Sequence, residues 1–533
     1  MRLREQPRWP IMRVNMRTIA VINATALNQY SFMPFAGGPS AFERVMALFL
    51  RLCAAQDILV IGGRDFDPAP MAEGVHLIQA PTWRMHTLLE KAKAFALERP
   101  EADILVYAHG DSPFLDLELS EGLLALHRQY RAEYSYADGY PPGFAPEILS
   151  TRALPNITEL ASRHHLPADR DGLFAVIQKD INSYDIETEL APKDLRGYRL
   201  SPLCDTKRNM QAAEALWAAG LRRAKDVLDL LPAHPELLRT LPAFLWVQIS
   251  EGCPQSCSYC PYPLMVGDPR AKQGFMPVQA FDSLMAQAEE LCDDLVVDLS
   301  LWGEPSLHPE FGAIAASVLA RKRFTLLIET CGLGWKPGVA EAVARAGGER
   351  VHWIVALDDP DPEAYAALRG EGMGEASDFT RRMAAEFPGQ VHAQAVRMQS
   401  NEERLEAFYR AWKKDIEKVI IQKYDSFAGT LPKLSVADLS PLERFPCRHL
   451  ARDLAVLIDG SVPPCKHCLV QGGVIKGGRQ GSGLGYAEIV ANVFEEGGLA
   501  KAWAGSSSWY DAHARKLYPV CCEACDEYHT FNA

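Results

Sequence analysis

The chain has 533 residues, 48% hydrophobic and 23% charged, which is enough for two or three domains with full-sized cores. A formal net charge of −13, with no basic run, argues against a nucleic-acid partner. No apolar run is long enough to cross a bilayer, so we expect no membrane span.

The distribution of cysteines predicts the domain organisation. Without an apolar signal core we expect a cytoplasmic protein, where structural disulfides are rare, so 13 cysteines suggest metal or cluster ligation. Only Cys53 and Cys204 precede residue 250, whereas six lie between Cys447 and Cys525. We expect disorder over residues 1–17, an α/β domain over 18–205, a helical linker over 206–243, a barrel over 244–430 and a cysteine-rich domain over 431–533.

The first domain alternates strands and helices. Short β-branched runs predict buried strands at Thr18–Asn23, Ile58–Ile61 and Ile104–Ala108. Ser40-Ala-Phe-Glu43 is a capping-box pattern that predicts the start of a helix. This alternation is typical of an α/β layer architecture.

The middle region repeats a strand–helix unit six times. The predicted strands are Phe244–Ser250, Leu295–Leu301, Phe324–Thr330, Val351–Leu357, Val391–Met398 and Lys418–Gln422. Six such units in series predict an open parallel (βα)6 partial TIM barrel. Its chemistry should gather at the carboxyl ends of the strands.

Three cysteines follow the first barrel strand in the spacing Cys253-x3-Cys257-x2-Cys260. Three thiolates on one short loop can ligate three irons of a cubane [4Fe–4S] cluster and leave the fourth iron open to a small molecule. Gly252 and Pro254 favour the loop that this convergence requires. The alternative is a structural zinc knuckle that lacks one ligand.

With this triplet the chain resembles the radical S-adenosylmethionine (SAM) superfamily. The resemblance implies that the open iron binds SAM and that reductive cleavage yields a 5′-deoxyadenosyl radical, which abstracts hydrogen from the substrate. It also implies an external electron donor such as flavodoxin or ferredoxin. The positions that match cosubstrate contacts in the family are Tyr259, Gly303, Glu304, Pro305, Thr330, Ala356, Asp358 and Arg397.

Three of these positions, and also Cys331, need comment. Cys331 and Ala356 stand where relatives often have Asn and Ser, which puts individual cosubstrate contacts in doubt. Arg397 either reaches the cosubstrate carboxylate or pairs with a surface acid. The alternative for Glu304 is an ordinary surface carboxylate after a turn. Cys331 is expected in the core, with a place near the radical as the alternative.

The tail resembles the SPASM/twitch auxiliary-cluster domain, and the whole chain resembles the spiro-SPASM family. Val456–Cys465 contains an Asp-Gly turn and predicts a hairpin. The resemblance implies one auxiliary [4Fe–4S] cluster, with two less favoured. Its ligands would be Cys447, Cys465, Cys522 and Cys525, with Cys468 and Cys521 as spare or alternative ligands. A zinc site on Cys465, Cys468, Cys522 and Cys525 is the other interpretation.

The N-terminal region resembles the cytidylyltransferase-type (GT-A-like) nucleotidyltransferases. Asp111 follows an apolar strand and matches their first metal-binding Asp, which implies Mg²⁺. The glycine-rich, arginine-containing phosphate loop is absent, so a degenerate substrate-recruiting domain is favoured over nucleotidyl transfer.

The leading hypothesis is therefore a radical SAM enzyme that acts on a peptide or on a sugar- or nucleotide-linked small molecule. The alternatives are a bifunctional or vestigial nucleotidyltransferase with ancillary clusters, and a non-catalytic iron–sulfur sensor or electron carrier.

Overall fold

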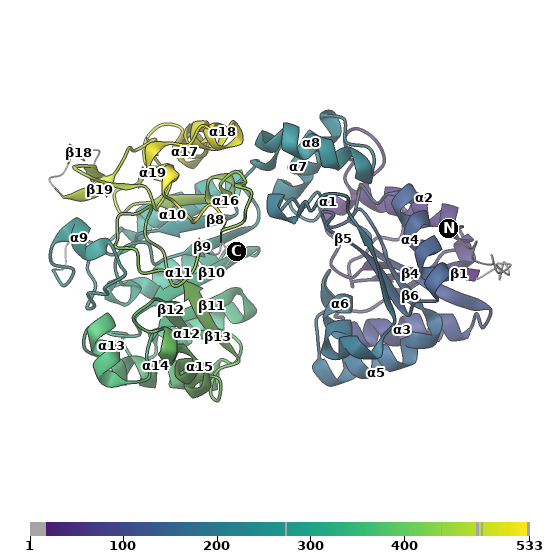
Figure 1. The fold of residues 1–533 in the computed structure, drawn as a ribbon, viewed down its shortest axis with the longest axis horizontal. Helices are drawn as coiled ribbons and strands as arrows, with labels where there is room; N and C mark the ends of the chain where they lie inside the picture. Colours follow the sequence, from purple (N-terminus) through teal and green to yellow (C-terminus); the bar gives the residue numbers. More distant parts are fainter. Residues whose placement is uncertain (1–16, 272–273, 439, 476–478, 481–482, 530–533) are drawn as a thin grey trace, which may run out of the picture. The chain divides into compact units, whose positions relative to one another are not determined.

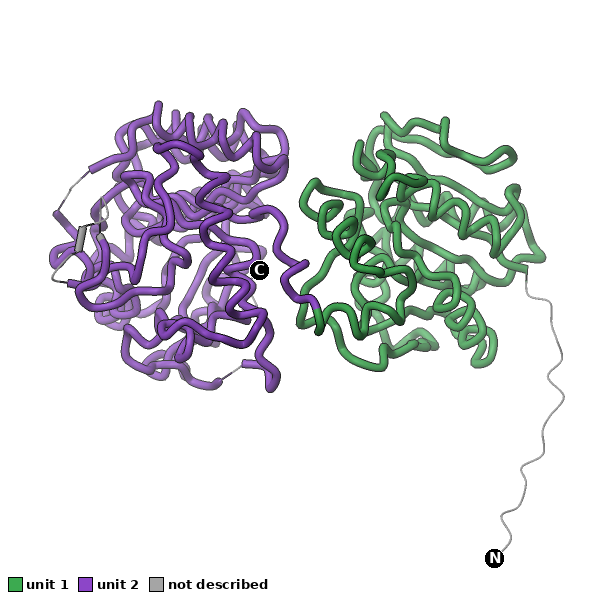
Figure 2. The backbone as a smooth tube through the Cα atoms, turned by 90° about the horizontal axis from the view of Figure 1, so that it is seen from above, with its two compact units in different colours: residues 1–233 green, residues 234–533 purple. Residues whose placement is uncertain are grey.

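The computed structural model describes residues 17–271, 274–438, 440–475, 479–480 and 483–529. The expectation for residues 1–17 falls outside this part of the chain, apart from Arg17. Two compact units divide between Ala233 and His234 (Figure 2). No described helix is both long and apolar enough to span a membrane.

Unit 1 is built on a seven-stranded sheet in the order β3-β2-β1-β4-β6-β5-β7. Its strands β1, β4, β5 and β6 are labelled in Figure 1. Only β6 runs antiparallel to its neighbours; the other pairs are parallel. The strands are β1 (Arg17–Ala24), β2 (Ile58–Gly62), β3 (His76–Gln79), β4 (Ala102–His109), β5 (Tyr134–Asp138), β6 (Glu147–Ser150) and β7 (Ile186–Leu190). The three predicted strands are confirmed as β1, β2 and β4.

Helices cover both faces of this sheet, because alternate residues of β1 enter separate cores. Ile19 and Val21 pack with helices α3, α5 and α6, whereas Ala20 and Ile22 pack with α2 and α4. Ser40 and Glu43 form the predicted capping box at the start of α2. The helices are α1 (Gln29–Phe32), α2 (Ala41–Leu52), α3 (Met85–Leu97), α4 (Leu117–Tyr130), α5 (Leu154–His164), α6 (Gly172–Ile177), α7 (Lys207–Ala218) and α8 (Val227–Ala233).

Unit 2 contains a second seven-stranded sheet, in the order β13-β12-β11-β10-β9-β8-β14, and all of its pairs are parallel. Strands β8 to β13 follow chain order, as six successive strand–helix units dictate. The strands are β8 (Phe244–Val247), β9 (Leu295–Asp298), β10 (Phe324–Thr330), β11 (Val351–Ala356), β12 (Val391–Arg397), β13 (Lys418–Lys423) and β14 (Asp453–Val456).

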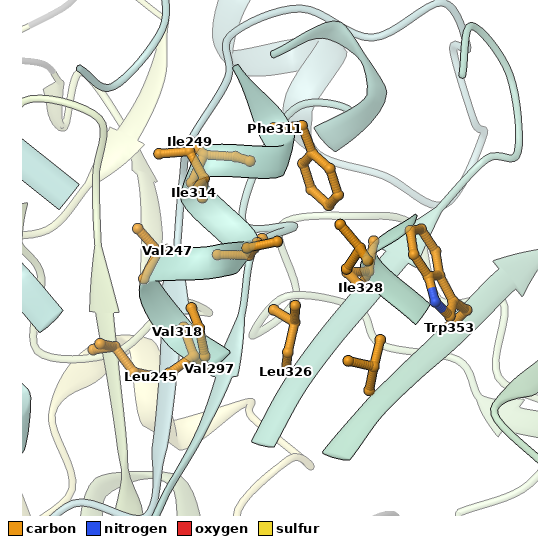
Figure 3. Packing of buried hydrophobic residues seen from close by; sticks show 14 of the residues in the cluster. Leu245, Val247, Ile249, Val297, Phe311, Ile314, Val318, Leu326, Ile328 and Trp353 are labelled. Carbon is orange, nitrogen blue, oxygen red and sulfur yellow. The ribbon is translucent and has the colours of Figure 1, made fainter. Parts of the chain in front are cut away.

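One face of this sheet carries the main core. Leu245, Val247, Val297, Leu326 and Ile328 occupy alternate strand positions and pack against the barrel helices (Figure 3). With its helices on one side, the sheet has the arrangement of an open (βα)6 barrel. The helices of the barrel region are α9 (Tyr262–Val266), α10 (Val278–Leu291), α11 (Phe311–Leu319), α12 (Val339–Gly347), α13 (Pro362–Leu368), α14 (Met373–Glu386) and α15 (Leu405–Trp412).

We call the opposite face of the sheet the inner face. Its positions lie between the core residues, and they include Trp246, Val296, Asp298 and Glu329. Trp246, Val296 and Glu329 are half-buried, in contrast to the fully buried core positions on either side. The inner face is therefore the partly accessible side of the sheet.

The tail differs from the predicted hairpin. Leu457 and Ser461 do enclose a tight turn, but β14 pairs with β8, and β15 (Ser461–Val462) pairs with β20 (Ala491–Asn492). The other tail strands are β16 (Leu469–Gln471), β17 (Val474–Ile475), β18 (Arg479–Gln480) and β19 (Leu484–Tyr486). The tail helices are α16 (Arg448–Arg452), α17 (Gly498–Gly505), α18 (Ser507–Ala514) and α19 (Val520–Glu523). Long-range pairing with the barrel sheet overrides the local hairpin signal.

Two neighbouring valines test the assignment of the faces. Val297→Ala should lower the free energy of unfolding by about 2 to 3 kcal/mol, because it removes two methyl groups from the fully buried core. Val296→Ala makes the same change on the half-buried inner face and should cost less than half as much. Denaturant unfolding measures both; equal losses would contradict the assignment.

Candidate cluster and cosubstrate site

The loop from Gly252 to Cys260 leaves the sheet directly after β8 and carries the three predicted cluster cysteines. Cys253, Cys257 and Cys260 are half-buried thiols, and each is close enough to at least one of the others to influence its pKa. Burial raises the pKa of Cys257 to about 11, so a metal has to displace a proton there. The loop thus brings its three thiols together, as a three-ligand cluster site requires.

A second segment, Leu368–Glu371, holds this loop by its backbone. The amides of Ser256 and Ser258 donate to the carbonyls of Arg369 and Leu368, each over 2.9 Å. The Gln255 side chain donates to the Glu371 carbonyl over 2.7 Å. These bonds fix the cysteine loop against the end of α13, so its shape does not depend on the loop sequence alone.

Tyr259, Asp358 and Arg369 form a buried polar group beside the loop. The Tyr259 hydroxyl donates to Asp358 Oδ2 over 2.5 Å, and Arg369 Nη1 lies 2.6 Å from the same oxygen. Asp358 Oδ1 accepts from the Val396 amide over 2.8 Å. Asp358 and Arg369 are almost fully buried, so the opposite charges compensate each other away from water.

Glu304 lies in the loop after β9 and is 2% exposed. Its Oε1 accepts from the Thr330 hydroxyl over 2.6 Å, and its Oε2 accepts from the Cys331 amide over 2.8 Å. Burial raises its pKa, and these hydrogen bonds oppose that shift. A carboxylate held this way keeps lone pairs for a further donor, such as an amino group.

Gly303 makes the approach of Glu304 to the cysteine loop possible. Its φ is +106°, and a Cβ there would lie 2.3 Å from the Ser250 carbonyl oxygen. The Glu304 amide then donates to the Gly252 carbonyl over 2.9 Å. Pro305 is buried at the start of the short helical turn that follows.

The remaining predicted positions are less closely connected. Ala356 ends β11 next to Asp358 and offers no polar group. Arg397 ends β12 and binds Glu402 through Nε and Nη2 over 2.7 and 2.6 Å, which is the surface pairing left open as the alternative. Cys331 is 4% exposed and belongs to the main core, yet its thiol also reaches Cys253 and Glu304.

The predicted auxiliary cysteines line one small cavity of about 20 Å³ in the tail. Cys447, Cys465, Cys522 and Cys525 are free thiols there, and they come from three segments far apart in sequence. His449 and His467 line the same cavity. Four thiols around one enclosed space fit the donor set of a fully ligated cubane cluster.

Cys468 departs from the prediction that made it a metal ligand. It forms a disulfide with Cys521, so its sulfur has no thiolate to offer in this state. The zinc interpretation that uses Cys468 would first require reduction of this bond. The disulfide separates the Cys465-x2-Cys468 pair, whereas Cys522 and Cys525 of the second pair both remain free thiols.

Asp111 of unit 1 lies after β4 and is bound by Arg170. The Asp205 carboxylate is close enough for Asp111 to raise its pKa, although burial is the larger cause. A pocket of about 200 Å³ beside them is lined by four tyrosines and Phe174, together with Arg170, His109 and Glu147. Two adjacent carboxylates suit a divalent cation, but here the Arg170 guanidinium already compensates Asp111.

Sequence reasoning gave Arg369 no individual role, although its stretch Tyr365–Gly370 resembles radical SAM enzymes. Nothing local reveals that its side chain is buried against Asp358. The one available signal was the pair of acids Asp358 and Asp359 after an apolar strand, because a buried carboxylate needs a cation.

Comparisons with known proteins connect the chain to a family and to a relative in another organism. The family model described as the radical SAM superfamily matches residues 247–422. A relative in Treponema pallidum (strain Nichols), described as an uncharacterized protein, is 33% identical over 379 residues, which cover 68% of this chain and 98% of the relative.

Two solved structures resemble the chain over different shares of its length. Streptococcus suis SuiB bound to the precursor peptide SuiA covers 70% of this chain and 84% of its own, with 14% identity and a TM-score of 0.39. A cytidylyltransferase from Leptospira borgpetersenii serovar Hardjo-bovis covers 42% of this chain and 96% of its own, with 16% identity and a TM-score of 0.34.

Replacing Asp358 tests the buried polar group. Asp358→Asn leaves the Arg369 charge buried without a counter-ion and should lower the free energy of unfolding by about 3 to 5 kcal/mol. Asp361→Asn, at the exposed cap of α13, is the control and should cost less than about 1 kcal/mol. Denaturant unfolding compares the two, and similar losses would show that the buried pair is not stabilising.

Proposed function

Because the chain belongs to the radical SAM superfamily, we propose that Cys253, Cys257 and Cys260 hold a [4Fe–4S] cluster in an enzyme that cleaves SAM. The bound cluster supplies one electron, received from a donor such as flavodoxin or ferredoxin, for cleavage of SAM to a 5′-deoxyadenosyl radical that abstracts hydrogen from substrate. The observation that carries this proposal is the convergence of three thiols from one loop that contains no fourth cysteine.

The chain's own residues orient the cosubstrate. Glu304, held by Thr330 and the Cys331 amide, presents a buried carboxylate to the amino group of SAM. Tyr259 is fixed by Asp358 and stands immediately before Cys260. Gly303 brings Glu304 close to the cysteine loop, so Glu304 would hold the amino group of SAM near the cluster that this loop would bind.

The tail cavity supports a second cluster. Cys447, Cys465, Cys522 and Cys525 supply four thiolates, which would leave no iron open to SAM. A cluster of this kind provides an electron acceptor, which suits net oxidation of a substrate radical. The protein encloses it with Leu450, Tyr528 and the Cys468–Cys521 disulfide, and these side chains limit water access.

For unit 1 we propose recruitment of the substrate rather than nucleotidyl transfer. Mg²⁺ on Asp111 and Asp205 would require Arg170 to move away from Asp111. The aromatic pocket beside them suits a sugar- or nucleotide-linked group, and a peptide substrate is the alternative.

Replacing one cluster cysteine tests the radical chemistry. Cys257→Ala should abolish 5′-deoxyadenosine formation from SAM and dithionite under anaerobic conditions, because a cluster ligand is lost. Cys53→Ala, in unit 1, should leave the yield unchanged. Product formation by Cys257→Ala at the wild-type rate, or none by the reconstituted wild-type chain, would contradict the proposal.

Iron counting tests the second cluster. The reconstituted wild-type chain should bind about eight iron atoms, and Cys465→Ser combined with Cys522→Ser should lower this to about four. The variant should keep the three-cysteine cluster, because its ligands lie on a separate loop. A wild-type count near four with bound zinc would instead support a structural zinc site in the tail.

A further inference from the structure

Two acidic residues stand in strands that are otherwise apolar. Asp298 ends β9 in the run Leu-Val-Val-Asp, and Glu329 is the penultimate residue of β10 in Leu-Leu-Ile-Glu-Thr. Their flanking residues Val297 and Ile328 point into the helix-side core (Figure 3). Because strand side chains alternate, both carboxylates face the inner face of the sheet.

The register places these two carboxylates close together. Asp298 pairs with Leu327 on the neighbouring parallel strand, and Glu329 is two residues further along the same face. Burial raises the pKa of both groups, and the Glu329 charge adds to the rise at Asp298. Two like charges in a desolvated site repel each other, and a cation between them would relieve this repulsion.

Asp298 keeps one oxygen unsatisfied. The residue is fully buried, and its Oδ1 accepts from the Ser300 amide over 2.7 Å. Its Oδ2 is also buried and has no hydrogen-bond partner among the described residues. A buried carboxylate oxygen of this kind is costly unless a donor reaches it, and this points to a ligand.

Lys466 carries a positive charge toward the pair but does not neutralise it directly. It lowers the pKa of both acids, so it is near them, yet the described structure contains no ion pair between it and either one. Its ammonium instead lies 3.3 Å from the centre of the Trp246 ring on the same face. Lys466 follows Cys465, so the auxiliary cysteine loop borders this site.

The pair also lies close to the candidate cosubstrate site. Glu329 precedes Thr330, whose hydroxyl donates to Glu304, and Asp298 precedes the loop that carries Gly303 and Glu304. A group bound at the pair would therefore lie on the strands that lead into the loops of the candidate cosubstrate site. Hydrogen abstraction requires the substrate in this region.

We propose that Asp298 and Glu329 bind a protonated amino group of the substrate on the inner face of the barrel. This inference rests on the proposed function, because it takes the inner face as the place where substrate lies. A neutral hydroxyl could satisfy one oxygen, but only a cation also offsets the repulsion between the two carboxylates.

Calorimetric titration of the reconstituted full-length protein tests this with 1,4-diaminobutane and its neutral analogue 1,4-butanediol. We expect the diamine to bind and the diol not to. Asp298→Asn and Glu329→Gln should each weaken diamine binding by at least about tenfold, because each removes a charge-assisted contact. Glu406→Gln, which removes a charge from an exposed helix, should leave it unchanged.

The inference would be overturned if the wild type did not bind the diamine or bound the diol as tightly as the diamine. It would also be overturned if the Asp298→Asn and Glu329→Gln variants both bound the diamine as tightly as the wild type. Thermal unfolding of each variant checks its fold, and half-buried Glu329 keeps the test available if Asp298→Asn does not fold. A parallel 5′-deoxyadenosine assay of the wild type separates the two claims. If the wild type forms no 5′-deoxyadenosine but binds the diamine in a way that depends on Asp298 and Glu329, the proposed function alone is rejected.

Discussion

Three thiols have to meet at one point, and the backbone around them is arranged to allow this. The loop after β8 cannot satisfy its own amides in a regular helix or strand while it turns its cysteines together. The carbonyls of Leu368 and Arg369 accept two of these amides, and the Gln255 side chain adds a third link. The proposed cosubstrate residues depend on this arrangement, because Glu304 and Tyr259 are positioned relative to the same loop.

The buried charges of the barrel follow from this constraint. Arg369 supplies a backbone carbonyl to the loop, and its side chain neutralises Asp358, which in turn fixes Tyr259. One residue thus connects loop shape, local charge and the aromatic side chain next to Cys260. On the inner face, neither Asp298 nor Glu329 forms an ion pair within the described part of the chain, and one Asp298 oxygen has no hydrogen-bond partner there. This contrast distinguishes a structural ion pair from a candidate ligand site.

Local patterns predicted much of this fold. The apolar runs gave the strands of the barrel, and the capping box of Ser40 and Glu43 gave the start of α2. The Asp-Gly turn of the tail was present, but its flanking strands pair with β8 and β20, which are distant in sequence. The Cys468–Cys521 disulfide escaped prediction for the same reason, since 53 residues separate its cysteines. Spacing identified the Cys253 triplet, whereas Arg369 required the three-dimensional packing.

The central claim is that the three-cysteine cluster leaves one iron open to SAM. Electron paramagnetic resonance of the reduced, reconstituted chain, recorded with and without SAM, tests it most directly. In a variant with Cys465 and Cys522 replaced, only the signal of the three-cysteine cluster would remain. The account predicts that SAM changes this spectrum. A spectrum indifferent to SAM, or zinc in place of iron on the Cys253 loop, would contradict it.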